Sequence, residues 1–533
     1  MTTIKYVLFL GLLLNVGHIK AQSKQRKPPN IVYIMSDDHG YQAISAYGYK
    51  LNHTPNIDRL AKEGALFTRA TVTNSLCSPS RAVLLTGKHS FINGKIDNES
   101  TFDWDQDNFA KLLQSAGYQT ALIGKIHMDG QPQGFDHSAV LIDQGEYYNP
   151  DFVINGEKQR QKGYVTDITT EMTIDWIAQR DTTKPFCVLY HQKAPHREWL
   201  PAVRHLAEYM EKTYPEPESL FDDFNNRGSA AKTAEMQILH HMNWSGDNKI
   251  PPSMMDELGI EEYLSWDKYA YNMHFDRMDK DDRAVFESTY APIMEDFKKR
   301  YPEMTSEDVL RWRYQRYMQD YMATVAAVDD GVGELLDFLE KENLDENTIV
   351  IYTSDQGFYL GEHGWFDKRF MYEESLRTPL LIRYPKEIPA QLTVDKLVQN
   401  LDFAPTILDY AGVEAPKEMQ GESFRRLLDG NINQDWRDVI YYTYYEYPSI
   451  HMVKRHYGIR TDRYKLIHFY YDVNEWELYD LKNDPKELNN VYNDPRYNEV
   501  RRNLHHKLEK TRAYYGDSEE LNHRFLKEAQ SQG

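Results

Sequence analysis

Cysteine, long apolar runs and an excess of basic residues are all missing from this chain of 533 residues. Only two cysteines are present, which excludes a disulfide-rich scaffold. Beyond the N-terminal segment, no stretch approaches the roughly 20 apolar residues that a membrane helix needs. Acidic residues outnumber basic ones by 82 to 62, giving a formal charge of −20. Nonspecific binding to nucleic acid or to an anionic membrane is therefore disfavoured, and an anionic ligand would need a local positive pocket.

The composition is otherwise that of an ordinary globular protein. Hydrophobic residues make up 41% and charged residues 27% of the chain. These proportions exclude disordered, collagen-like and coiled-coil proteins. The length predicts one large domain or two unequal ones with a sizeable core.

The N-terminus has the layout of a secretory signal peptide. A short segment carrying Lys5 precedes an apolar run over residues 6–16, and Ala21 is a suitable cleavage point. No cysteine lies next to that point, so a lipoprotein anchor is not indicated. We therefore expect residues 1–21 to be removed and the mature protein to reach the periplasm or the medium.

Short apolar segments that end in polar residues recur along the chain. They span residues 30–36, 120–124, 185–192 and 347–354. The polar residues that follow them are Asp37 and Asp38, Lys125 and His127, His196, and Asp355 and Gln356. Because amphipathic stretches such as 108–115 and 322–340 separate these segments, the pattern predicts an α/β sheet with helices on both faces. Ligands of such sheets bind beyond the carboxyl ends of the strands.

Two further regions differ in composition. Residues 198–318 are rich in Met, Tyr, Trp and charge, and predict a mainly helical insertion that either covers the sheet or forms a wall of a substrate cleft. Residues 435–533 contain Tyr-rich strand-like pieces, which predict a smaller antiparallel sheet and a helix over 498–515. We therefore expect a main domain over 22–434 and a C-terminal subdomain over 435–533. The 39 tyrosines are better explained by strand packing than by carbohydrate stacking.

The two cysteines leave two interpretations open. In an exported protein, Cys77 and Cys187 would ordinarily form one disulfide. Alternatively, Cys77 is consumed by other chemistry and Cys187 stays as a buried thiol.

The segment over residues 77–87, CSPSRAVLLTG, favours the second interpretation. It matches the signature C-x-P-S-R-x-x-x-L-T-G at every fixed position, and the chain thereby resembles the type I sulfatase family. The resemblance implies that Cys77 is oxidised to formylglycine, whose hydrate attacks the sulfate sulfur. It also implies a partner, either a formylglycine-generating enzyme or an anaerobic sulfatase-maturating enzyme. Arg81, on the same helix face as Cys77, would hold the formylglycine hydrate.

The resemblance also implies a metal site. Asp37, Asp38, Asp355 and Gln356 supply carboxylate and amide oxygens, which are hard ligands suited to Ca²⁺ or Mg²⁺. We assign one Ca²⁺, with the formylglycine made from Cys77 completing the ligand set. Gln356 stands where the family most often has Asn, but it keeps the amide oxygen.

Further positions match catalytic residues of the family. The segment GYQTALIGKIH follows the second signature G-Y-x-T-x-x-x-G-K-x-H, in which Lys125 would bind sulfate and His127 would support the hydrate or the sulfate. His196 corresponds to a histidine that acts on the leaving group or binds sulfate. Lys368 corresponds to a lysine that contacts the sulfate and the bridging oxygen.

The similarity extends over residues 30–385 and more weakly beyond, and implies the alkaline-phosphatase-like fold. Residues 355–385 most resemble bacterial polysaccharide sulfatases of the N-acetylglucosamine-6-sulfatase-like kind, and related enzymes act on algal glycans such as ulvan. His363, Asp367 and Arg369 either touch a sugar or support the structure. Two other functions stay open: a formylglycine-dependent phosphonate monoester hydrolase or phosphodiesterase, and a glycan-binding pseudoenzyme.

Overall fold

The computed structural model describes residues 27–431 and 435–532. The expected signal peptide over residues 1–21 lies outside the described residues. Within the described part of the chain, no helix combines the length and the apolar character that crossing a bilayer requires.

Four parallel strands form the centre of the sheet. Strand β1 (Asn30–Ser36) pairs in parallel with β8 (Phe186–His191) on one side and with β9 (Thr348–Ser354) on the other. Strand β4 (Gln119–Gly124) lies parallel to β8. These are the four strands that the apolar segments predict, and their carboxyl ends meet at one edge of the sheet.

Further parallel and antiparallel pairs extend this centre into a mixed sheet, with β5 parallel to β4 and β11 parallel to β2. Among the described residues its order is β11-β2-β10-β9-β1-β8-β4-β5-β6-β7, ten strands in all. Strand β10 runs antiparallel to β9, and β6 antiparallel to β5. The outer strands are β2 (Ala65–Phe67), β5 (His137–Leu141), β6 (Asp151–Ile154), β7 (Glu157–Arg160), β10 (Leu380–Arg383) and β11 (Leu392–Val394).

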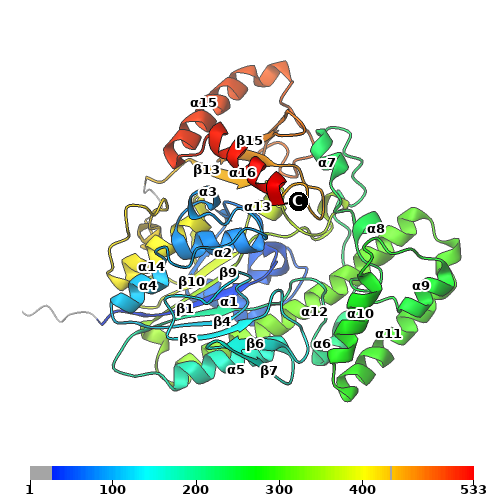
Figure 1. Ribbon diagram of the computed structural model, residues 1–533, viewed down its shortest axis with the longest axis horizontal. Coiled ribbons are helices and arrows are strands. Elements are labelled where there is room, and N and C mark those ends of the chain that lie inside the picture. The colour runs from blue at the N-terminus through cyan, green and yellow to red at the C-terminus, as the bar shows by residue number, and fades with distance from the viewer. Residues whose placement is uncertain (1–26, 432–434, 533) are drawn as a thin grey trace, which may run out of the picture.

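Helices cover both faces of the sheet, as predicted. Alternate residues of β1 point to opposite faces, so Tyr33 lies in one apolar core and Ile34 in the other. The core that contains Ile34 is closed by α1 (Pro55–Glu63), α5 (Val165–Ala178) and α12 (Ser306–Lys341). The core that contains Tyr33 is closed by α2 (Cys77–Thr86), α4 (Phe109–Ser115) and α14 (Phe403–Ala411). Figure 1 shows α2 and α4 on one side of the sheet and α5 on the other.

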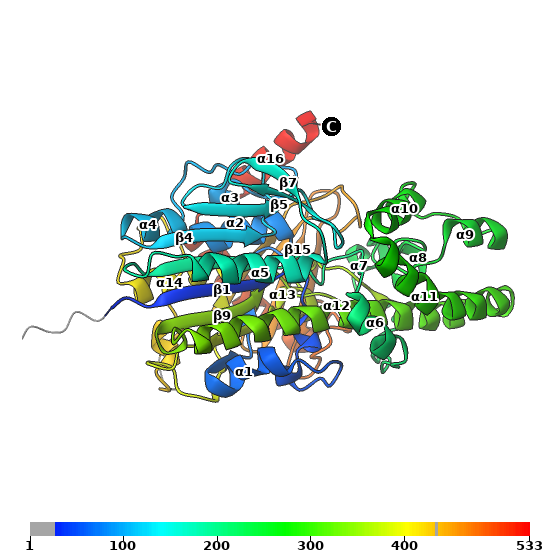
Figure 2. The ribbon, with the colours of Figure 1, turned by 90° about the horizontal axis from the view of Figure 1, so that it is seen from below.

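A group of helices extends to one side of the sheet (Figure 2). It contains α6 (Val203–Met210), α8 (Ile238–His241), α9 (Pro252–Leu258), α10 (Asp267–Arg277) and α11 (Lys280–Arg300). Helix α7 (Ser229–Thr233) packs instead against the C-terminal part of the chain. Helix α12 runs from this group along the sheet, so the helix predicted over 322–340 is only its C-terminal half. Its start is fixed by a capping box, in which the Thr305 hydroxyl accepts from the backbone N–H of Asp308 and the Asp308 carboxylate accepts from that of Thr305.

The C-terminal part contains the antiparallel sheet that the sequence predicts. Its strands are β13 (Val439–Tyr444), β14 (His456–Thr461), β15 (Tyr464–Phe469) and β16 (Glu475–Asp480), in that order. Helix α15 (Asn498–Tyr515) matches the predicted range and ends at Gly516, whose φ is 80°. Tyr441, Tyr442 and Tyr444 are fully buried, so these tyrosines pack the sheet and do not form an exposed stacking surface.

Candidate active site

Buried carboxylates gather where β1 and β9 end. Ser36 pairs with Ser354 in the parallel register, so the residues that follow each strand are neighbours. Carboxylate oxygens of Asp37, Asp38 and Asp355 all lie within 4.8 Å of one another. All three side chains are buried.

These carboxylates compete for positive charge. Burial, together with the charge of Asp37, raises the pKa of Asp355 to about 8 even though Arg81 opposes the shift. Burial also raises the pKa of Asp38 to about 6 against the opposing charge of Lys368. For Asp37 burial acts in the same direction, but the charges of Lys125 and Arg81 outweigh it and hold the pKa well below the usual range. Additional positive charge bound at the cluster would therefore stabilise the ionised carboxylates.

Gln356 supplies a free oxygen beside this cluster. Its Nε2 donates a hydrogen bond to Asp38 Oδ1. Its Oε1 is buried and has no hydrogen-bond partner among the described residues. Three carboxylates and one orphaned amide oxygen are the donor set of a hard divalent cation, so the residues fit such an ion.

Cys77 begins helix α2 at the rim of the same cluster. Its Sγ lies 3.5 Å from Asp37 Oδ1. Burial and the charge of Asp37 raise the pKa of the thiol well above its usual value, so little thiolate is present at neutral pH. Cys187 lies in β8 inside the apolar core, and both cysteines are unpaired. The interpretation of one disulfide is therefore wrong.

Arg81 lies one helical turn after Cys77 and joins three strand ends. Its Nε and Nη2 lie 3.1 and 2.9 Å from Asp355 Oδ2. Its Nη1 donates to the backbone oxygen of Lys125 at 2.5 Å, and Nη2 lies 3.6 Å from Asp37 Oδ1. The guanidinium thus fixes the carboxylates that surround residue 77.

Lys125 and His127 enter the site from the end of β4. The Lys125 ammonium contacts the Asp37 carboxylate and the side-chain oxygen of Gln144. His127 Nε2 lies 3.0 Å from Gln144 Nε2. Gln144, in the loop after β5, is a site residue that the sequence did not predict, because no motif surrounds it.

His196 and Lys368 approach Asp38 from two other loops. Lys368 Nζ donates to Asp38 Oδ2 at 2.8 Å, and His196 Nε2 lies 3.7 Å from the same oxygen. His196 Nδ1 lies 2.5 Å from the backbone oxygen of Arg197, which requires Nδ1 to carry a proton. Burial and the charge of Lys125 hold the pKa of His196 well below its usual value, so the free site contains a neutral imidazole.

Four residues of these loops have left-handed backbone conformations. Asp38, His127, Asp367 and Arg369 have φ values of 63°, 53°, 74° and 93°, in the left-handed region that non-glycine residues rarely adopt. Such strain persists only where surrounding contacts enforce it, and it is typical of functional sites.

The structure separates the three residues that the sequence suggested for sugar contact: Asp367 and Arg369 lie at the candidate active site, and His363 does not. Asp367 and Arg369 flank Lys368, and Arg369 Nη1 donates to Glu446 Oε1 at 2.6 Å. The C-terminal part also supplies His451, whose Nε2 lies 3.4 Å from Asp367 Oδ2. His363 is instead buried beside Asp222, with Nδ1 3.1 Å from Oδ2, which agrees with a structural role.

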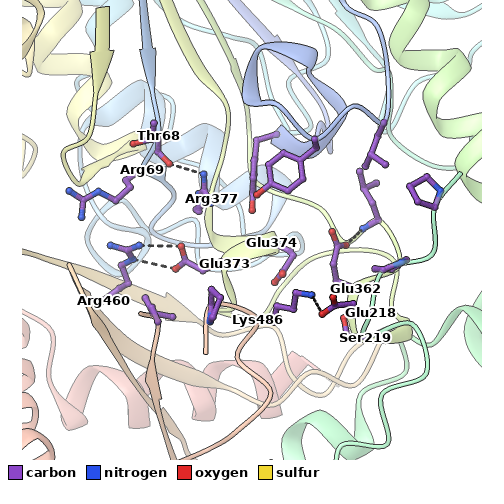
Figure 3. Close-up of a pocket in the computed structure, with 18 of the residues that line it drawn as sticks. Thr68, Arg69, Glu218, Ser219, Glu362, Glu373, Glu374, Arg377, Arg460 and Lys486 are labelled. Atoms are coloured by element: carbon purple, nitrogen blue, oxygen red, sulfur yellow. Dashed lines mark hydrogen bonds and ion pairs between the residues drawn. The ribbon is translucent and has the colours of Figure 1, made fainter. Parts of the chain in front are cut away.

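A separate pocket of about 770 Å³ lies elsewhere on the molecule (Figure 3). Arg69, Arg377, Glu373, Glu374 and Arg460 are among its lining residues. None of the predicted site residues lines this pocket, so it is distinct from the candidate active site.

Comparison with known families agrees with this geometry. The sequence model of the family described as Sulfatase matches residues 29–413. The chain belongs to the sulfatase family. This sulfatase is therefore a sulfuric ester hydrolase with the alkaline-phosphatase-like fold. A second model, described as N-sulphoglucosamine sulphohydrolase, C-terminal, matches residues 361–514.

Named relatives cover nearly the whole sulfatase. An N-acetylglucosamine-6-O-sulfatase of Bacteroides thetaiotaomicron is 49% identical over 503 residues, which cover 93% of this chain and 88% of the relative. An ulvan-active sulfatase of Formosa agariphila is 24% identical over 98% of this chain and 89% of its own length. A protein solved in complex with its substrate D-glucosamine-2-N,6-O-disulfate is 49% identical, with a TM-score of 0.88 over 92% of this chain and 99% of that chain.

An ionic clamp connects the helical group to the loops of the active site. His274 of α10 has Nδ1 2.9 Å from Glu146 Oε2 and Nε2 2.8 Å from Glu198 Oε2. Glu146 follows Gln144 in the same loop, and Glu198 follows His196. Burial lowers the pKa of His274, but the two carboxylates outweigh it and raise the pKa to about 9.

We expect His274→Gln to destabilise the protein in a pH-dependent way. Because the folded-state pKa of about 9 lies above the ordinary 6.5, the clamp contributes fully below pH 6.5 and is lost as the pH rises towards 9. The difference in unfolding free energy between wild type and variant should be about 3 kcal/mol at pH 6 and shrink by pH 9.5. Chemical denaturation at several pH values measures it, with the exposed His53→Gln as control. A difference that is constant with pH would contradict the clamp.

Proposed function

We propose that this sulfatase hydrolyses the 6-O-sulfate ester of glucosamine units in a sulfated glycan, using a formylglycine made from Cys77 and one Ca²⁺. The observation that carries the proposal is the place of Cys77, at the start of α2 and 3.5 Å from the Asp37 carboxylate. The substrate class rests on the 49% identical relatives, one named N-acetylglucosamine-6-O-sulfatase and one solved with a glucosamine disulfate.

The buried thiol at position 77 is a poor nucleophile, since its pKa is raised by burial and by Asp37. When formed, the formylglycine supplies a hydrated aldehyde whose oxygen attacks sulfur and which can later release sulfate by restoring its carbonyl. That oxygen would lie near the position of Cys77 Sγ. Its neighbour Asp37 can accept a proton there, while Arg81 keeps Asp355 in position.

Asp37, Asp38, Asp355 and Gln356 would hold the calcium ion. The ion would supply Lewis-acid stabilisation of sulfate oxygens and would compensate the three carboxylates. This assignment is supported by the separations of less than 4.8 Å between oxygens of the three aspartates and by the unpartnered Gln356 Oε1.

Lys125 and Lys368 provide fixed positive charge on either side of the cluster, through contacts with Asp37 and Asp38 respectively. Charges that are already oriented stabilise the developing negative charge without reorganisation. His196 Nδ1 is held on the Arg197 carbonyl, which leaves Nε2 facing the centre. An entering sulfate favours protonation of Nε2, so His196 can donate that proton to the leaving sugar oxygen. His127 and Gln144 would position Lys125.

The biological setting completes the proposal. Cleavage near Ala21 would deliver the enzyme to the periplasm or the medium, and a formylglycine-generating or anaerobic sulfatase-maturating enzyme would convert Cys77. The main domain over 22–434 would carry the chemistry, with the insertion over 198–318 and the subdomain over 435–533 forming the walls of the sugar site. Asp367 and Arg369 would contact the sugar. The enzyme would act in polysaccharide degradation.

The proposal is tested by sulfate release from defined substrates, using protein whose Cys77 conversion has been checked by peptide mass. We expect release from 6-sulfated N-acetylglucosamine and from heparan oligosaccharides, and none from Cys77→Ala protein, because that variant lacks the nucleophile. Ulvan and carrageenan oligosaccharides test the algal alternative. A phosphonate monoester and a phosphodiester are included as rival substrates.

Turnover of the phosphonate or phosphodiester alone would overturn the proposal in favour of the hydrolase alternative. Tight glycan binding without turnover by fully converted protein would instead identify a pseudoenzyme.

Removing the metal should lower both activity and stability. A ligand present at 100 to 1,000 times its dissociation constant stabilises the folded state by about 3 to 4 kcal/mol, and the clustered carboxylates lose this compensation on chelation. We expect the melting temperature to fall after exhaustive chelation and to recover with Ca²⁺ more fully than with Mg²⁺. Calorimetry of the same sample before and after each step measures this. Unchanged melting after chelation would contradict the metal assignment.

A further inference from the structure

Lys193 lies at the catalytic edge of the sheet but was not among the predicted site residues. It follows β8 directly after Gln192, whose backbone N–H donates to the oxygen of Met35 at 2.8 Å. The N–H of Asp37 in turn lies 3.4 Å from the oxygen of Ala194. These contacts continue the pairing of β8 with β1 beyond the strand ends. Lys193 is thereby placed beside the residues that carry the carboxylate cluster.

The ammonium of Lys193 lacks the kind of partner that its neighbours have. Only 2% of the residue is exposed, and its Nζ lies 4.7 Å from the centre of the Tyr147 ring. Among the described residues no hydrogen bond or ion pair to Nζ is found. The nearby carboxylates of Glu146 and Glu198 are both engaged by His274.

The other cations around the site are each matched by a carboxylate. The pairs are Arg81 with Asp355, Lys125 with Asp37, Lys368 with Asp38, Arg197 with Asp247, and Arg369 with Glu446. The charges of Glu146 and Glu198 act on Lys193, but both carboxylates are paired with His274, and burial of the cation is costly because a cation–π contact replaces only part of its hydration. Burial and the charge of Lys125 lower the pKa of Lys193 to about 8, in keeping with this cost. An anionic ligand would remove the cost.

The reacting sulfate is not the best candidate for that anion. It would lie at Cys77 between Lys125 and Lys368. Lys193 is turned towards the Tyr147 ring, whose hydroxyl donates to the backbone oxygen of His196 at 2.5 Å. The ammonium therefore lies on the side of Tyr147 and Glu146.

We propose that Lys193 is a specificity-determining residue that binds a second anionic substituent, a sulfate or a carboxylate, on the sugar unit that carries the reacting sulfate. The inference rests on the proposed function, because it assumes a sulfated sugar at Cys77. It assigns the enzyme a preference for multiply charged units over singly sulfated ones.

The test compares binding of two sugars to calcium-loaded, full-length Cys77→Ala protein by calorimetry. The probes are D-glucosamine-2-N,6-O-disulfate and N-acetylglucosamine-6-sulfate, which differ in charge at the second position. Adding Lys193→Met should raise the Kd for the disulfate about tenfold more than the Kd for the monosulfate, since only the disulfate loses an ion pair. Lys193→Arg should restore most of the difference. Lys184→Met, at the opposite end of the same strand and largely exposed, is the matched control.

Equal weakening of both sugars, or no change in either, would overturn the assignment of Lys193. Sulfate release by converted wild-type protein is measured in parallel. Absence of release together with a shifted Kd ratio would contradict the proposed function while supporting the role of Lys193, so the two failures can be told apart.

Discussion

Compensation of three buried carboxylates is the constraint on which the rest of this site depends. Asp37, Asp38 and Asp355 lie together because β1 and β9 are adjacent parallel strands in register. Arg81 and Lys125 reach this cluster from separate elements and pair with its members. In the proposed mechanism, the same compensation lets an enzyme with a formal charge of −20 bind an anion. The positive charge that binds the anion would then come from residues of the site itself, despite the negative net charge of the whole chain.

The sequence predicted the centre of the fold, and it named residues that the structure brings together at one edge of the sheet, for identifiable reasons. Buried parallel strands are short apolar runs with polar ends, and the signature after Cys77 is contiguous. The outer strands were not predicted, since segments such as β7 (Glu157–Arg160) are exposed and polar. Gln144 and His451 were missed because they lie in loops without motifs and reach the site only through tertiary packing. Lys193 was not predicted because only the three-dimensional structure shows that its ammonium is buried without a hydrogen-bond partner among the described residues.

The regions outside the signature connect the reacting centre to the rest of the molecule. Helix α10 is fastened by His274 to the loops of Gln144 and His196, and the C-terminal part supplies Glu446 as a partner of Arg369. Both contacts hold loops that carry residues of the candidate active site. In the proposed mechanism, the family motif supplies the reacting groups, whereas these later elements would shape the space in which a sugar lies.

The central claim is that residue 77 acts only after conversion to formylglycine, inside a charge-compensated cluster. The most direct measurement varies the converted fraction of Cys77, determined by peptide mass spectrometry, and records sulfate release from 6-sulfated N-acetylglucosamine in each preparation. The account predicts turnover proportional to the converted fraction and none in unconverted protein. Full activity in protein that retains the thiol would contradict it.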